Sequence, residues 1–414
     1  MANYVLYGDG IHDDYPAIQE MLDSGVCEVT LPAPKVCYLI SKTLVIPSCC
    51  KLTLPRFAEI RLMDGANCYM LMNRTVSSPA KRIQDDMNDV AAHIYGFVDL
   101  YSQEEADVCS NFEIEGGIWN FNNMNQLPNP QQTKDYGPDG DFWGIGMLFY
   151  NAKNFRLANM TLKDPTNYAV EIDVASYFTF ENITFDFNYG NPYAVNMDGI
   201  HLNGNCHYGA FRNLKGACYD DLVALNAHEG SRGDITNIDI DGIYAENCHS
   251  AVRLLTVCND IRNVRIANVY GTYYQYCIGF TKYYPGETTG CFDSILLENI
   301  FASKAKRLPV QEIHMGASKD YQFPFIWLQD ETVVKSLSVR GLHRKETDVP
   351  VATVQVEPTA VAERLHIEDV TLENLTDTHC PVLQNLGKIG KLTLIDVPYG
   401  ALEGDGTVDL LREI

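Results

Sequence analysis

The chain lacks the features that would carry it into or across a membrane. None of its 414 residues falls in an unbroken apolar run of 18. Its first residues, MANYVLYGDG, lack the basic start, apolar stretch and cleavage site of a secretory signal. We therefore expect a cytoplasmic protein with no membrane partner, an expectation that leaves secretion by another route open.

The 13 cysteines lack the spacing of redox or metal sites. They are scattered and odd in number, with no C-x-x-C pair and no His/Cys cluster of zinc spacing. Buried reduced thiols in a cytosolic protein explain them better, and the adjacent Cys49 and Cys50 fit a loop better than a redox site. We expect no metal and no cofactor.

Basic residues are scarce. There are 31 Lys and Arg residues against 54 Asp and Glu, which gives a formal net charge of −23. This balance argues against nucleic acid or an anionic membrane surface as a partner. It also disfavours long polyanions as ligands, relative to short or neutral ones, unless a local basic patch offsets the field.

Helix signals are equally rare, and only residues 11–25 show a strong one. Asp14 is a possible N-cap, Pro16 fits the first turn and Gly25 the end. The apolar residues of this helix are Ile18, Met21 and Leu22. We expect it to cover one end of a β-rich core, because the segments that follow are short apolar stretches broken by turn residues.

A unit of strand, turn and strand recurs about every 23 to 31 residues from residue 154 onward. The successive units begin at Asn154, Tyr177, Cys206, Arg232 and Ile261, and weaker units continue to the C-terminus. A unit that cannot bury its apolar face alone must stack on its neighbours. The sequence therefore predicts an all-β fold, a right-handed parallel β-helix forming a single domain over residues 1–414.

The later strands of these units align by their alternation of apolar and polar residues. Two apolar columns are predicted to point inward: Val170, Ile200, Val223, Val252 and Ile278, then Ile172, Leu202, Leu225, Leu254 and Phe280. The outward columns are Glu171, His201, Ala224, Arg253 and Gly279, then Asp173, Asn203, Asn226, Leu255 and Thr281. We expect this outward face to be polar and exposed to solvent.

The remaining segments follow from this register. Residues 74–145 fit the repeat poorly and include a stretch rich in Pro, Gly, Asn and Asp, so a loop-rich insertion is predicted there. Such a loop commonly walls one side of a groove. Residues 154–291 are the predicted catalytic coils, and residues 292–414 are C-terminal coils.

Three aspartates precede two of the aligned strands. Asp198 and Asp221 should stack one coil apart, at about 4.8 Å between strands, with Asp220 one residue aside. Three carboxylates this close would raise the pKa of at least one, because like charges disfavour ionisation. A protonated carboxyl beside ionised ones supplies the acid and the base that inverting glycoside hydrolysis needs.

Asp residues are also common at turns, and these three could instead cap backbone groups or hold a calcium ion. Their predicted convergence beside His201, His249 and Arg253 favours a functional site.

Two segments resemble known motifs. NMDGIHLNG and YDDLVALN are similar to the NTDG and DD motifs of glycoside hydrolase family 28, the polygalacturonase family. YGDGIHDDYPAIQ resembles the opening of many pectin-lyase-like β-helices, and GGIWNFNN and LFYNAKNFRLANMTLKDP resemble further family segments. The resemblance covers most of residues 5–290.

The resemblance implies that Asp220 is the general acid, while Asp198 and Asp221 hold and deprotonate the attacking water. Two basic motifs of the family are displaced. His249 lies one position before the expected slot, which Ser250 occupies. Arg253 lies one coil early, and the coil after it reads IGFTK.

The expected substrate is an oligosaccharide or polysaccharide, with galacturonides among the candidates. The expected substrate-binding residues are His201, His249, Arg253, Tyr276 and Lys282. His201 could alternatively tune Asp198, and Arg253 and Lys282 could form salt bridges to nearby acids rather than a carboxylate clamp. Tyr276 is the first choice for sugar stacking.

Two alternatives to an inverting hydrolase stay open. One is a carbohydrate-binding or structural β-helix of the phage-tail type, in which the aspartates form turns. The other is a lyase acting on uronates. The sequence does not indicate the oligomeric state, the sugar, the linkage or whether the action is endo or exo.

Overall fold

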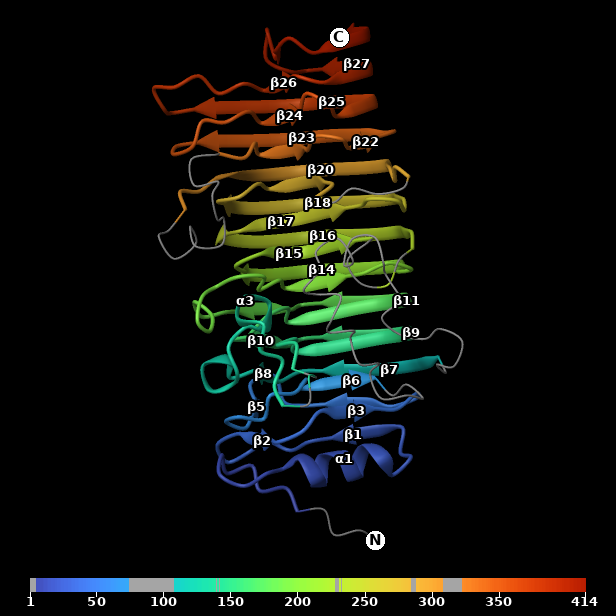
Figure 1. Cartoon of the computed structure of the whole chain (residues 1–414), viewed down its shortest axis with the longest axis vertical. Helices are drawn as coiled ribbons and strands as arrows, with labels where there is room; N and C mark the ends of the chain where they lie inside the picture. The colour runs from blue at the N-terminus through green and yellow to red at the C-terminus, as the bar shows by residue number, and fades with distance from the viewer. Residues whose placement is uncertain are drawn as a thin grey trace.

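Short strands stack coil upon coil along one long axis, from a helix at the N-terminal end to the last strand at the C-terminal end (Figure 1). The computed structural model describes residues 5–73, 108–138, 140, 142–227, 231, 233–283, 288–307 and 322–414. Its architecture is a right-handed parallel β-helix, as predicted from the repeat. No helix in these residues is long and apolar enough to cross a membrane.

The strands form three parallel sheets along the axis. The first sheet includes the N-terminal parts of β9 (Met147–Ala158) and β11 (Val170–Glu181), and it carries the candidate site. Its other strands are β3 (Leu44–Ile46), β6 (Leu71–Asn73), β13 (Ile200–Leu202), β15 (Asp221–Asn226), β17 (Ser250–Leu255), β19 (Ile278–Thr281), β21 (Ile326–Leu328), β24 (Val354–Val356), β26 (Leu383–Asn385) and β28 (Leu402–Glu403).

The second sheet is built mainly from longer strands. From β14 (His207–Ala217) onward, single strands continue through both the second and the third sheet. The second sheet contains β1 (Glu28–Thr30), β4 (Lys51–Thr53), β7 (Cys109–Glu115), β9 (Met147–Ala158), β11 (Val170–Glu181), β14 (His207–Ala217), β16 (Ile235–Cys248), β18 (Ile261–Tyr273), β20 (Phe292–Lys304), β22 (Val333–Val334), β23 (Leu337–Glu346), β25 (Val361–Asn374), β27 (Lys388–Ile395) and β29 (Thr407–Glu413). The third contains β2 (Tyr38–Ile40), β5 (Glu59–Leu62), β8 (Ile118–Asn120), β10 (Thr161–Lys163) and β12 (Thr184–Asp186).

The predicted N-terminal helix is present but shorter, as α1 (Tyr15–Asp23). It buries Ile18 and Leu22 against the first coil and closes the core at that end. Asp14 occupies the N-cap position, yet its side chain makes no bond to the helix. Its carboxylate instead accepts the backbone N–H groups of Tyr7 at 2.6 Å and Leu39 at 3.2 Å, so it ties the N-terminal segment to β2.

Asparagines occupy one bend of successive coils, the turn from the second sheet to the third. Asn159, Asn182 and Asn213 all have left-handed backbone conformations, which Asn tolerates better than most residues. Their side chains stack in a ladder, in which Asn182 donates to Asn159 at 3.0 Å and Asn213 donates to Asn182 at 3.3 Å. Each turn is therefore bonded to the turn of the next coil.

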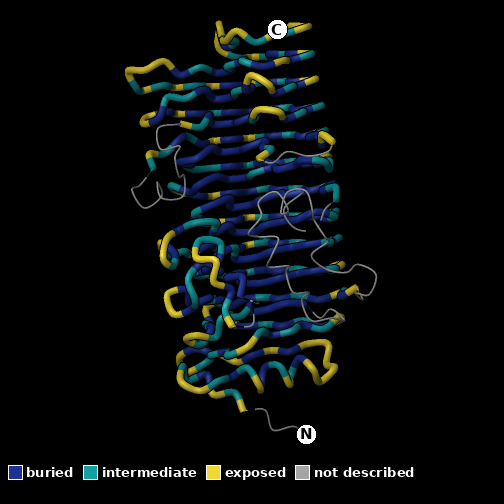
Figure 2. The backbone as a smooth tube through the Cα atoms, viewed as in Figure 1, coloured by how far each residue is buried: buried dark blue, intermediate teal, exposed yellow. Residues whose placement is uncertain are grey.

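The predicted register of the inward columns is confirmed. Val170 pairs with Ile200, which pairs with Val223 and so on through Val252 and Ile278. These residues belong to one apolar core that continues to the C-terminal coils. Figure 2 shows the same pattern, with buried residues along every coil and exposed ones concentrated where strands turn and at the two ends.

The outward columns are not exposed, and that prediction is wrong. Glu171, His201, Asp173, Asn203, Asn226 and Thr281 are all buried. One cover is a second apolar cluster outside the first sheet, where Tyr136 and Trp143 pack on Leu148 and Tyr150, and Tyr168 joins its edge. Alternation alone predicts which residues leave the core but not what lies over them.

The predicted insertion at 74–145 is too wide. Residues 74–107 lie outside the described residues, but β7 and β8 fall within the rest and pair with neighbouring coils. The irregular part follows β8 and contains a 3-10 turn, η1 (Asn123–Asn125), and a one-turn helix, α3 (Pro130–Thr133). This segment supplies the aromatic cover over the first sheet.

Candidate active site

Three aspartates lie where β13 and β15 begin in the first sheet. The pairing of Ile200 with Val223 places Asp221 beside Asp198 one coil away, with Asp220 one residue aside. Their exposed fractions are only 1% for Asp198, 8% for Asp220 and 0% for Asp221. Away from bulk water, hydrogen bonds and charges act more strongly on each carboxylate.

Asp198 accepts hydrogen bonds on both oxygens. Nδ1 of His201 lies 2.5 Å from Oδ2, and the backbone N–H of Asp221 donates to Oδ1 at 3.2 Å. The far ring nitrogen of His201, Nε2, lies 2.9 Å from Nδ2 of Asn226. Tyr168 stacks on the imidazole with ring centroids 4.0 Å apart, and His201 is 1% exposed. The expected contact of His201 with a sugar does not fit this covered position.

Asp221 is held by three side chains. Nε of Arg253 forms an ion pair with Oδ2 at 2.6 Å. The hydroxyl of Ser250, which is in register with Asp221, donates to Oδ1, and the phenol of Tyr276 donates to the same oxygen at 3.4 Å. These groups all favour the ionised carboxylate.

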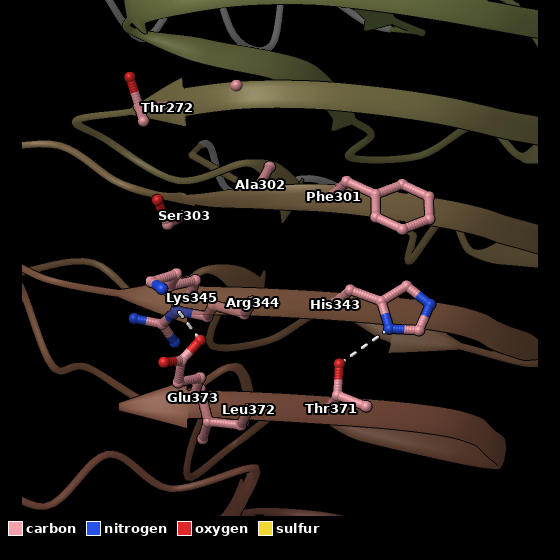
Figure 3. A pocket seen from close by; sticks show the side chains of 11 residues that line it. Thr272, Phe301, Ala302, Ser303, His343, Arg344, Lys345, Thr371, Leu372 and Glu373 are labelled. Carbon is pink, nitrogen blue, oxygen red and sulfur yellow. Dashed lines mark hydrogen bonds and ion pairs between the residues drawn. The ribbon is translucent and has the colours of Figure 1, made fainter. Parts of the chain in front are cut away.

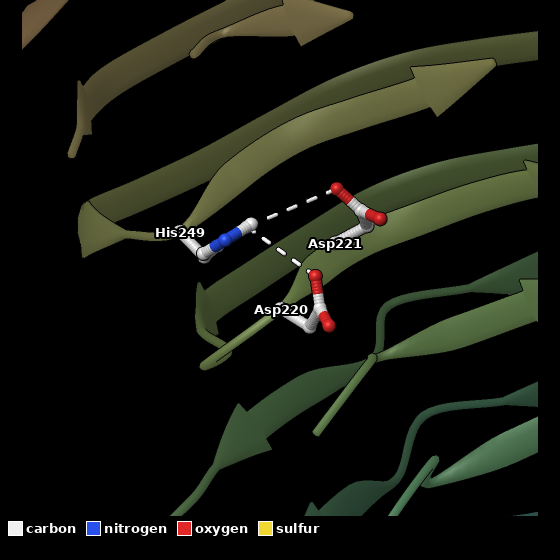
Figure 4. A group of neighbouring side chains, drawn as sticks. All are labelled: Asp220, Asp221 and His249. Carbon is white, nitrogen blue, oxygen red and sulfur yellow. Dashed lines mark ion pairs between the residues drawn. The ribbon is translucent and has the colours of Figure 1, made fainter. Parts of the chain in front are cut away.

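Asp220 meets His249, and Figure 4 shows the imidazole facing both neighbouring carboxylates. Nδ1 of His249 lies 3.5 Å from Oδ1 of Asp220 and 3.9 Å from Oδ1 of Asp221. His249 precedes Ser250 just as Asp220 precedes Asp221, and Ser250 pairs with Asp221. The displacement of the histidine by one position therefore brings it beside Asp220.

The two basic residues expected near the cluster, Arg253 and Lys282, lie in different places. The guanidinium of Arg253 contacts Asp221 and lies 5.7 Å from the ring centre of Tyr283. Lys282 forms an ion pair with Glu331 at 3.3 Å, beyond the next strand of the sheet. Arg253 therefore belongs to the cluster, whereas Lys282 is engaged one coil further on.

Tyr276 supports the cluster from below the surface. Its ring is buried, with its centre 5.8 Å from that of Trp327, and burial raises the pKa of its phenol well above the usual value. A β-carbon at Gly279 would lie 2.7 Å from this ring, so the glycine makes room for it. The expected stacking of sugar on Tyr276 does not fit this buried position. Of the two tyrosines, Tyr283 is the accessible one, with 40% of its surface exposed.

Sequence reasoning missed the roles of Asn226 and Tyr168. The repeat placed Asn226 only in an outward column. Ala224, the residue of β15 in register with His201, is small and leaves the ring of His201 open to contact from Asn226 on the same strand. Tyr168 lies in the turn before β11, where the repeat carries no signal. Only the coil geometry brings its ring onto the imidazole.

Asp220, Asp221 and His249 could also act as metal ligands, since their candidate atoms lie within 4.8 Å of one another. However, Arg253 already places a permanent positive charge 2.6 Å from Asp221. A divalent cation would have to displace that ion pair or share the carboxylate with it. The arrangement therefore fits proton transfer better than metal binding.

A separate hollow, with a cavity volume of about 600 Å³, lies over β18, β20, β23 and β25 (Figure 3). Phe301 stacks on His343 with ring centroids 4.7 Å apart, and His343 bonds Thr371 at 2.8 Å. Lys345 and Glu373 form an ion pair at 3.2 Å. Glu373 is the only carboxylate among its described lining residues, so the hollow lacks the carboxylate pair found at the aspartate cluster.

A buried lysine lies behind the site. Nζ of Lys304 donates to the carbonyl oxygens of Gln275 and Tyr274, and the N–H of Gln275 donates to the carbonyl of His249 at 2.9 Å. Burial, followed by the charges of Arg344 and nearby Arg307, holds the pKa of Lys304 well below its usual value.

Lys304 should make stability depend on pH. Below pH 10.5 the unfolded chain carries the lysine proton, whereas above its lowered pKa the folded chain does not. Stability therefore rises with pH in that window, by about 1.4 kcal/mol per pH unit where the unfolded state binds one full proton more than the folded state. We expect Lys304→Met to remove this rise. Calorimetric melting temperatures of both proteins from pH 7 to 9 test it, and parallel curves would contradict it.

No protein-family model and no curated protein matches this sequence. Solved structures match over nearly all of it. They include the family 28 exopolygalacturonase of Yersinia enterocolitica (TM-score 0.57, 11% identity, 99% of this chain and 77% of that chain) and the endo-xylogalacturonan hydrolase of Aspergillus tubingensis (0.57, 13%, 98% and 98%). The tailspike of Escherichia coli bacteriophage HK620, solved with a pentasaccharide, also matches (0.60, 11%, 96% and 75%). At these identities the matches establish the fold.

Proposed function

We propose that this protein is a glycoside hydrolase of the polygalacturonase type that cleaves an oligosaccharide with inversion. The arrangement of the three carboxylates supports this most directly. Asp198 and Asp221 are each surrounded by donors that favour the anion, while Asp220 is the most exposed of the three. Most glycoside hydrolases use one protonated and one ionised carboxyl, placed on either side of the scissile bond.

The roles follow from these surroundings. Two neighbouring anions favour the protonated form of Asp220, because like charges disfavour ionisation. Asp220 then protonates the leaving oxygen, and His249 at 3.5 Å orients it. Asp198 and Asp221 hold and deprotonate the water. This assignment agrees with the resemblance to glycoside hydrolase family 28.

A short oligosaccharide is the proposed substrate, with galacturonides among the candidates. The net charge of −23 opposes the approach of a long polyanion. Arg253 supplies a positive charge at the cluster, and the exposed ring of Tyr283 beside it offers an apolar face to a sugar.

The test is the release of reducing sugar from a panel of pectic and neutral oligosaccharides. We expect release from at least one of them, with the first product appearing as the inverted anomer by NMR before mutarotation. No release from any of them would overturn the proposal, and a retained anomer would overturn inversion.

Deep burial of Asp198 and Asp221 favours a second candidate, a carbohydrate-binding β-helix whose aspartates only brace the turns. It predicts oligosaccharide binding by calorimetry without any product. A uronate lyase differs from both, because it forms an unsaturated product that absorbs in the ultraviolet. Calcium-dependent absorbance, abolished by EDTA, would identify that reaction.

A further inference from the structure

His201 is fixed in place on three sides. One ring nitrogen meets Asp198 at 2.5 Å, the other meets Asn226 at 2.9 Å, and Tyr168 covers a face of the ring. The side chain is 1% exposed. A sugar therefore has no path to this ring, although the ring touches a carboxylate of the cluster.

These contacts select one tautomer. The amide nitrogen of Asn226 is a donor, so Nε2 of His201 accepts its hydrogen and carries none. The single ring proton of a neutral imidazole then lies on Nδ1 and points at Oδ2 of Asp198. With the backbone N–H of Asp221 on Oδ1, Asp198 is aligned by two donors.

Charged groups lie on the strands beside this pair. Glu171 of β11 is in register with His201, and Asn203 donates to it at 3.1 Å and to Asp173 at 3.0 Å. On the other side Ala224 separates the ring from Arg253, one coil further. Asp221, one coil away, donates its backbone N–H to Asp198 at 3.2 Å.

We propose that His201 is a positioning residue, held as the Nδ1–H tautomer by Asn226, that orients Asp198 as the ionised base. The inference rests on the proposed hydrolase, because Asp198 needs a fixed orientation only if it acts on a water. The imidazole neither touches the sugar nor transfers a proton.

Two substitutions separate the two ring nitrogens. In His201→Asn the amide nitrogen lies close to the place of Nδ1, so the donor to Asp198 is kept. In His201→Gln it lies close to the place of Nε2, so the donor to Asp198 is lost. Both remove the ring that stacks on Tyr168, which makes them a matched pair for packing.

We expect His201→Gln to lower kcat by on the order of 10- to 100-fold, part of what a general base supplies, with KM changed by less than about threefold. The acidic limb of its pH profile for kcat/KM should move to higher pH. Asp198 loses a donor to its charged form, and this loss raises its pKa. His201→Asn should keep the wild-type limb and most of kcat. His343→Asn, at a histidine bonded to Thr371 on another sheet, is the control that should change neither.

A readout without activity tests the tautomer itself. With 15N-labelled histidine, the signals that disappear in His201→Asn should have the shifts of an Nδ1–H imidazole from pH 5 to 8. Asn226→Asp should convert them to the doubly protonated form, because Nε2 then faces an acceptor.

The outcomes are distinguishable. If wild type hydrolyses none of the oligosaccharides, the proposed function fails, and the NMR signals still report on His201. If hydrolysis occurs but His201→Asn and His201→Gln behave alike, or the ring titrates freely between pH 5 and 8, the positioning role is wrong.

Discussion

Asp220→Asn is expected to lower kcat by about 10²- to 10⁴-fold, the range that general acid catalysis supplies. An amide of the same shape keeps the contacts of the side chain but has no acidic proton for the leaving oxygen. KM should change little, because most substrate contacts remain. Initial rates of reducing-sugar release, measured over a range of substrate concentrations, give both constants.

The leaving group distinguishes the acid from the base. The nitrophenolate released from a nitrophenyl glycoside departs without protonation, so Asp220→Asn should recover much of its activity on such a substrate. Asp198→Asn should not. Asp409→Asn, at an exposed position in the last strand, is the control for loss of one negative charge. If Asp220→Asn retained more than about a third of wild-type kcat on the natural bond, another group would be the acid.

Much of the fold could be predicted because the repeat records it directly. Inward residues such as Val223 and Val252 must match their neighbours in adjacent coils, so their alternation is visible along the chain. The stacking of Asp198 on Asp221 follows from the same register. Proximity in a solenoid is set by position within the repeat, which a sequence contains.

The surroundings of the aspartates could not be predicted in this way. Tyr168, Trp143 and Tyr136 belong to turns and an irregular segment with no period, and they bury a face that alternation marks as exposed. The partner of Lys282 could not be predicted for a related reason, although a salt bridge was one of its two expected roles. Its partner Glu331 lies beyond the next strand, after a long connection whose course the repeat does not specify.

Arg253→Met is the second substitution with a large expected effect. It leaves Asp221, which is fully buried, without its ion-pair partner at 2.6 Å. Breaking a buried pair by removing one member costs about 3–5 kcal/mol, because the remaining charge is uncompensated. We expect a loss of this size in the free energy of unfolding by denaturant titration, together with loss of activity.

The double variant Arg253→Met/Asp221→Asn tests the cause. Removal of the remaining charge should restore most of the lost stability, because Ser250 and Tyr276 can still bond a neutral amide. The two effects should then be strongly non-additive in a double-mutant cycle. Activity should stay low in the double variant, since the second anion that favours a protonated Asp220 is absent. Additive stability losses would show instead that Arg253 acts through packing on Tyr283, and Asp221 would then lose its place as the fixed anion of the cluster.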